Sequence, residues 1–176
     1  MSEISMAKTS LPKNREFQKK FADLLALYDR EKPNFDDINL STMMNRLAKS
    51  KPENYELTQR EKNEILFRRL PETIMYRLRH FDSIGIANTA NAFARLGIKH
   101  ELLFAELAYV AMKKMVELNP QHLSNVSNAF AKMGIKHEAL FAEIARETMK
   151  KIDQFEPQDL ANTANAFTKL EIKNEP

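Results

Sequence analysis

The sequence predicts an all-α fold, a right-handed type of α-solenoid in which helical hairpins stack with a 37-residue period. A segment that begins at Ile86 returns at Leu123 and again, in part, at Leu160, 37 residues apart each time. A fixed period of this length is typical of stacked supersecondary units. Apolar residues recur at helical spacing within each copy, and the chain has only three glycines, too few for a protein rich in tight strand turns.

The first helix of each copy has a start and an end that can be located. Starts are expected where a capping side chain precedes serine or proline, at Asp82, Asn119 and Glu156. Ends are expected at the equivalent positions Leu96, Met133 and Leu170. Glycine follows the first two, where a left-handed residue can end the helix at little steric cost. Glu171 replaces glycine in the last copy, so we expect that turn to be strained or altered.

The second helix of each copy starts after a shared polar position. This position holds His100, His137 and Asn174. Because asparagine is a common N-cap and shares the position with both histidines, we interpret these side chains as caps or turn contacts rather than as metal ligands. The second helix is predicted to continue to Glu117 and, in the next copy, to Asp153.

The two faces of the first helix differ in chemistry. Ile86, Ala90 and Phe93 form an apolar stripe, which we assign to the core rather than to base stacking. The opposite face carries two asparagines and a cation at positions i, i+3 and i+7. In the three copies this set is Asn88, Asn91, Arg95; Asn125, Asn128, Lys132; and Asn162, Asn165, Lys169. Stacked copies would align these side chains into two columns of amides and one of cations.

A divergent copy precedes the clear ones. The segment around Leu40 places Asn45 in the position of Asn91 and Lys49 in that of Arg95. A capping box at Thr58 is followed by a helical pattern that Pro71 interrupts. The predicted organisation is a flexible N-terminus over 1–14, a capping helix over 15–36, a divergent repeat over 37–80, repeats over 81–117 and 118–154, and a half repeat over 155–176. The half repeat indicates one of two things: the segment is cut from a longer protein, or its apolar edge is covered by another chain.

Composition limits the classes of protein that remain. The net charge is +3, but residues 81–176 carry 11 Lys/Arg against 12 Asp/Glu, so polyanion binding there depends on how charges are placed. The chain has no cysteine, and its N-terminus lacks an apolar stretch of signal-peptide length. We expect an intracellular protein, cytoplasmic or organellar, with no membrane contact. Export into a host cell by a non-classical route would leave no such N-terminal signal and so stays open.

The repeated segments IANTANAFARLGI and LANTANAFTKLEI resemble the first helix of octotricopeptide repeats, including versions found in proteins of intracellular bacteria. The resemblance covers Phe81 to Pro176 well and Asp37 to His80 loosely. Similar repeats occur in organellar RNA-maturation factors and in suspected bacterial effectors. The resemblance implies a superhelix of helical hairpins that binds single-stranded RNA at roughly one base per repeat.

Three function classes follow, in order of preference. The first is a single-strand RNA-binding module in which the amides contact bases and Arg95, Lys132 and Lys169 contact phosphates. In the competing interpretation, Asn88, Asn125 and Asn162 bond to turn backbones or neighbouring amides and only fix the stacking. The second class is a scaffold whose groove binds a peptide or helix, with self-association through the C-terminal edge as a further expectation. An enzyme comes last: HELLF at His100 lacks the second histidine of a zinc protease helix, and we predict no cofactor or metal.

Overall fold

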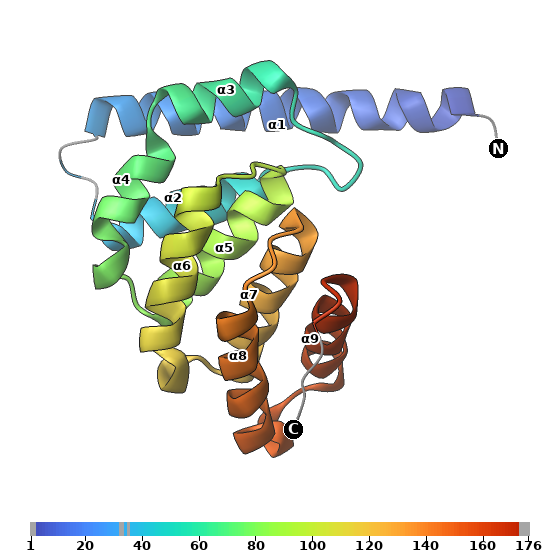
Figure 1. The fold of residues 1–176 in the computed structure, drawn as a ribbon. Helices are drawn as coiled ribbons and strands as arrows, with labels where there is room; N and C mark the ends of the chain where they lie inside the picture. The colour runs from blue at the N-terminus through green and yellow to red at the C-terminus, as the bar shows by residue number, and fades with distance from the viewer. Residues whose placement is uncertain (1–2, 32–33, 35, 173–176) are drawn as a thin grey trace.

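The computed structural model describes residues 3–31, 34 and 36–172, and in that part of the chain all regular secondary structure is helical (Figure 1). The α-helices are α1 (Glu3–Glu31), α2 (Asp37–Ser50), α3 (Gln59–Phe67), α4 (Leu70–Arg77), α5 (Ser83–Leu96), α6 (Glu101–Lys113), α7 (Pro120–Met133), α8 (Glu138–Lys150) and α9 (Pro157–Lys169). Three short 3₁₀ helices follow α4, α6 and α8: η2 (Leu78–His80), η3 (Met115–Glu117) and η4 (Ile152–Gln154). The all-α prediction is confirmed.

Apart from α1 and α3, the described α-helices form two layers. Helices α2, α5, α7 and α9 lie side by side in chain order, and each packs extensively against the next (Figure 1). Helices α4, α6 and α8 form the second layer and contact one another over only a few residues. Each first-layer helix from α5 onward therefore belongs to a predicted copy, and α2 occupies the place predicted for the divergent one.

Local capping explains where the first-layer helices begin. The Asp82 carboxylate accepts a hydrogen bond from the backbone N–H of Gly85 at 2.7 Å, and the Asn119 side chain accepts one from His122 at 2.8 Å. These bonds satisfy backbone donors that the first helical turn leaves without partners. Glu156 occupies the same position before α9 but makes no capping hydrogen bond with its side chain.

The ends of these helices share one turn geometry. Gly97 and Gly134 are left-handed, with φ of 68° and 64°. The residue after each glycine donates its backbone N–H to a phenylalanine carbonyl one turn back, at 3.0 Å for Ile98 to Phe93. Glu171 adopts the same left-handed conformation, with φ of 53°. The last turn is therefore strained, as predicted, and α9 ends at Lys169, one residue before the predicted Leu170.

The second-layer helices are capped by histidine. Nδ1 of His100 accepts the backbone N–H of Leu103, and Nδ1 of His137 accepts that of Leu140, both at 3.1 Å. The capping interpretation is confirmed for both residues, while Asn174 lies outside the described residues. The prediction for the helix ends needs a correction: α6 and α8 end at Lys113 and Lys150, and the 3₁₀ helices η3 and η4 complete the segments.

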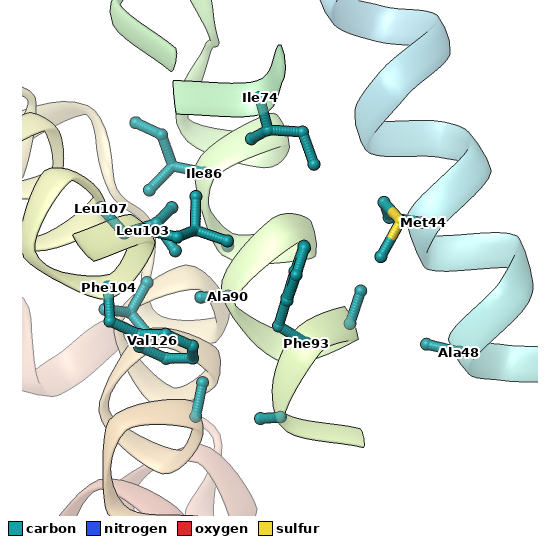
Figure 2. Close-up of a cluster of buried hydrophobic side chains, with 14 of the residues drawn as sticks. Met44, Ala48, Ile74, Ile86, Ala90, Phe93, Leu103, Phe104, Leu107 and Val126 are labelled. Atoms are coloured by element: carbon teal, nitrogen blue, oxygen red, sulfur yellow. The ribbon is translucent and has the colours of Figure 1, made fainter. Parts of the chain in front are cut away.

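The core lies between the two layers and between neighbouring first-layer helices. Ile86, Ala90 and Phe93 are fully buried, and Figure 2 shows Phe93 on the side of α5 that faces Met44 of α2. The core assignment of these residues is confirmed. On α9 the equivalent stripe is partly open, and Leu160 keeps 38% of its surface because no described helix follows to cover it.

Two lysines tie the end of a hairpin to the turn before its own first helix. Nζ of Lys114 donates a hydrogen bond to the carbonyl of Phe81 at 2.7 Å, and Nζ of Lys151 donates one to the carbonyl of Leu118 at the same distance. These positions are equivalent in successive copies. Because each carbonyl belongs to the turn before a first-layer helix, the bonds hold the two ends of each hairpin together. Nζ of Lys151 also donates to the carbonyl of Val116, in the preceding copy, at 2.9 Å.

The N-terminal part differs in detail from its prediction. The capping box between Thr58 and Glu61 is present, and the helix break falls at left-handed Arg69, which precedes α4 and Pro71. Helix α1 begins at Glu3, within the range predicted to be flexible, and ends at Glu31 instead of residue 36. The earlier end has a local cause, because Asp36 accepts the backbone N–H of Asn39 and so begins α2.

Candidate nucleic-acid interface

One stripe of each first-layer helix stays uncovered. On α5, Asn88 and Asn91 are half-buried and Arg95 is exposed, whereas the residues between them are buried. The spacing puts the three side chains on one face, and the neighbouring helices and the second layer cover the rest of α5. The stripe is therefore the surface that α5 presents to solvent.

The next two helices present the same stripe. The first amide of each set is half-buried, and the second amide and the cation are exposed; these residues are Asn125, Asn128 and Lys132 on α7 and Asn162, Asn165 and Lys169 on α9. Since α5, α7 and α9 lie side by side, the structure brings all nine predicted residues onto adjacent helices. Their role in binding stays a prediction.

The amides are largely free of internal bonds. Among the described residues, only Asn162 of the six makes a side-chain hydrogen bond, in which its Oδ1 accepts the Nε2 amide of Gln158 at 3.0 Å. Within the described residues, Asn88 and Asn125 lack the bonds to turn backbones or neighbouring amides that the stacking interpretation required, whereas Asn162 does bond an amide, that of Gln158 within α9. Amide groups with both donor and acceptor unused can pair with the edges of bases.

Two further sets of residues continue the stripe. Helix α2 adds Thr42, Asn45 and Lys49 at the positions of Asn88, Asn91 and Arg95, so the cation column extends to four helices. A fourth row lies one turn before the first amides and consists of Ile38, Ile84, Gln121 and Gln158, all exposed. Both sets can be found by aligning the copies. The sequence prediction nevertheless left Asn45 and Lys49 out of the site and did not include the fourth row.

The cations of the stripe are electrostatically uncompensated. In the described part of the chain, Arg95, Lys132 and Lys169 form no ion pair. Burial lowers the pKa of Lys51, and the positive charges of Lys132 and Arg95 lower it further. Side chains from α5, α7 and the segment after α2 therefore converge at the C-terminal ends of these helices.

No cluster of candidate metal ligands accompanies the stripe in the described part of the chain. Among the described residues, no group of three or more His, Cys, Asp or Glu side chains could hold a metal ion. Within the same residues, no helix is long and apolar enough to span a bilayer. The stripe offers amide edges and positive charge, which suit recognition of a polar anionic chain.

A family model described as RNA-editing substrate-binding complex 6 protein, RESC6, matches residues 30–176. The chain belongs to the RESC6 family. The match includes α2 to α9, and so the whole stripe. No curated protein matches the chain. The RESC6 family is RNA-associated, which agrees with the class of protein that the sequence resemblance implied. The closer relation to octotricopeptide repeats stays an expectation, and the match lends no support to a bacterial effector.

Proposed function

We propose that this RESC6-family chain is a non-enzymatic module that binds a short single-stranded RNA along α2, α5, α7 and α9. The observation that carries the proposal is a row of amides beside a column of cations, repeated on adjacent helices. Among the described residues, Asn162 is the only one of these amides with a side-chain hydrogen bond, and none of the cations forms an ion pair. Base edges would pair with the amides, and phosphates would contact Lys49, Arg95, Lys132 and Lys169.

The repeated spacing suits a modular mode of recognition. Packed helices lie about 8–10 Å apart, so equivalent side chains recur once per helix at that interval. Repeat proteins that assign one base to each helical repeat use two or three side chains per base. Asn88, Asn91 and Arg95 supply such a set on α5, and α7 and α9 supply equivalent sets.

The proposal includes a right-handed superhelix with its first layer on the concave side. First-layer helices pack closely against one another, whereas second-layer helices touch over few residues. When helices are closer together in one layer than in the other, the stack curves toward the layer with the closer spacing. The amide rows would then line the inner surface, where a strand can contact several helices at once.

Local charge would drive binding despite a near-neutral repeat region. Residues 81–176 carry 11 Lys/Arg against 12 Asp/Glu, so attraction must come from the cation column. A strand that contacts four cations should bind with a salt slope of about −3, because single strands contribute about −0.7 per neutralised phosphate. With so few repeats, affinity for RNA should be modest.

A protein-binding role is the second candidate, because the second layer exposes apolar side chains. Tyr76 of α4, Leu102 of α6 and Met149 of α8 keep 76%, 69% and 72% of their surfaces exposed. The family name refers to a complex, so we propose that the chain acts inside the cell as a member of an assembly, with RNA on one layer and protein partners on the other. Self-association through α9 stays a further expectation.

The experiment that tests the RNA proposal is a salt titration of RNA binding. Fluorescence anisotropy with a mixed-sequence RNA oligonucleotide would be measured as salt rises, for the native chain and for a variant with Arg95→Glu, Lys132→Glu and Lys169→Glu. We expect the variant to lose affinity and most of the salt slope, whereas a charge reversal at Lys113, on the second layer, changes little. If the native chain shows no salt-dependent binding to RNA, the protein-binding scaffold is favoured.

A further inference from the structure

A pocket of about 500 Å³ opens at the C-terminal ends of α5 and α7. It is lined by the segment between α2 and α3, by the turn at Gly97 and by Met133. Four cations line it: Lys51, Lys62, Arg95 and Lys132. Only two of them belong to the predicted site, so the pocket combines the cation column with two lysines from another part of the chain.

The pocket holds an excess of positive charge. Glu53 and Glu56 also line it, which leaves four cations against two carboxylates. Lys51 is half-buried, and its ammonium donates to the backbone carbonyls of Pro52, at 3.4 Å, and of Tyr55. In the described part of the chain, Lys62, Arg95 and Lys132 form no ion pair. Clustered like charges repel, so the cluster is best satisfied by an external anion.

The cations of this cluster gather at the C-terminal ends of helices. Lys51, Arg95 and Lys132 lie at the ends of α2, α5 and α7, where a cation is favoured. Lys62 lies within α3, and its Nζ is 3.7 Å from the point that a Cβ on Gly97 would occupy. Its ammonium therefore lies beside the turn that ends α5, where the dipole of α5 favours a cation from another helix.

We propose that this pocket binds a phosphate group of the RNA strand and so anchors one end of the strand on the amide rows. A phosphate offers several oxygens to cations that approach from four different parts of the chain, and the volume leaves room for the attached sugar. Because Arg95 and Lys132 border both the pocket and the stripe, a phosphate held there continues directly onto the stripe. This inference rests on the proposed function in naming RNA as the source of the phosphate.

The test uses the full chain with Lys62→Met, since Lys62 is outside the stripe and makes no ion pair or side-chain hydrogen bond among the described residues. Lys113→Met is the matched control, because it removes one positive charge from the second layer, where Lys113 lies 4.4 Å from the ring centre of Tyr109. Lys62→Arg keeps the charge. RNA affinity and salt slope would be measured by anisotropy with oligonucleotides that carry or lack a 5′-phosphate, and circular dichroism would check folding.

We expect Lys62→Met to weaken RNA binding about tenfold and to make the salt slope shallower by about 0.7, with both restored by Lys62→Arg and unchanged in Lys113→Met. If the loss appears only with the 5′-phosphorylated strand, the pocket holds a terminal phosphate; if it appears with both strands, it holds an internal one. Equal binding by Lys62→Met and the native chain would overturn the pocket while leaving the stripe proposal intact.

A second measurement separates the pocket from the proposed function. Inorganic phosphate should raise the thermal midpoint of the native chain and of Lys113→Met more than that of Lys62→Met, at matched ionic strength. General exclusion of phosphate from the surface would raise all three equally, so the difference isolates the site. If phosphate stabilises the native chain more than Lys62→Met but no RNA binds, the phosphate pocket is supported and the RNA function fails. If the phosphate-induced shifts are equal and no RNA binds, both proposals are overturned.

Discussion

The ring of Phe104 on α6 lies edge-on against the ring of Phe130 on α7, with centroids 5.1 Å apart and planes at 76°. Phe141 on α8 and Phe167 on α9 repeat this relationship at 4.9 Å and 79°. In both pairs the second helix of one hairpin contacts the first helix of the next. The aromatic contact therefore joins neighbouring copies, and it sets the register in which their polar stripes align.

Phe130→Ala should destabilise the protein by about 3–5 kcal/mol, because it empties a fully buried site and removes the edge-to-face contact. Urea unfolding followed by circular dichroism would measure the change. Phe167→Ala is the matched variant, and it should cost clearly less since Phe167 is only half-buried. Equal costs for the two variants would mean that burial does not decide the strength of this contact.

Glu171→Gly should raise the free energy of unfolding by about 1 kcal/mol, because Glu171 has φ of 53° and glycine adopts this conformation without a Cβ penalty. Gly134→Ala makes the reverse change at the equivalent turn, where no atom lies within 4 Å of an added Cβ. It should be destabilising for backbone reasons alone. A destabilising Glu171→Gly would contradict the left-handed geometry of the last turn.

Stability should fall at acidic pH through Glu147. A hydrogen bond from Lys151 lowers the pKa of this carboxyl below 4.5, with a further bond from Lys150 acting in the same direction. A depressed pKa contributes stability that is present above the unfolded value and is lost as the pH falls through the folded value. The stability difference between the native chain and Glu147→Gln should shrink from pH 6 toward pH 3 in urea titrations. A difference independent of pH would exclude the carboxylate charge as its cause.

Asn128→Ala should weaken RNA binding and leave stability within about 0.5 kcal/mol, because the amide is exposed and makes no hydrogen bond among the described residues. Asn119→Ala is the contrasting variant on the same helix. Its side chain caps α7, so its loss should cost about 1 kcal/mol of stability while RNA affinity of the folded protein stays unchanged. The proposal for the stripe would fail if Asn128→Ala bound RNA as tightly as the native chain.

Helix positions followed from local chemistry, which is why they could be predicted. Asp82 and Asn119 bond to N–H groups three residues away, and Gly97 and Gly134 close their own turns. The amide and cation stripe followed from helical spacing in the same way. The 3₁₀ ends after α6 and α8 were missed, because the hydrophobic pattern continues through them without a break in the sequence.

The sequence by itself determined the hairpins, their caps and which side chains share a helix face, because these depend on residues within a few positions of each other. Only the tertiary structure decided that Asn88 and Asn125 are free of backbone bonds and that Lys51 and Lys62 converge on Arg95 and Lys132. Those four cations are far apart along the chain, and no periodicity relates the α2–α3 segment to the repeats. Their meeting depends on how the divergent first copy packs beside α5, which is a property of the assembled helices.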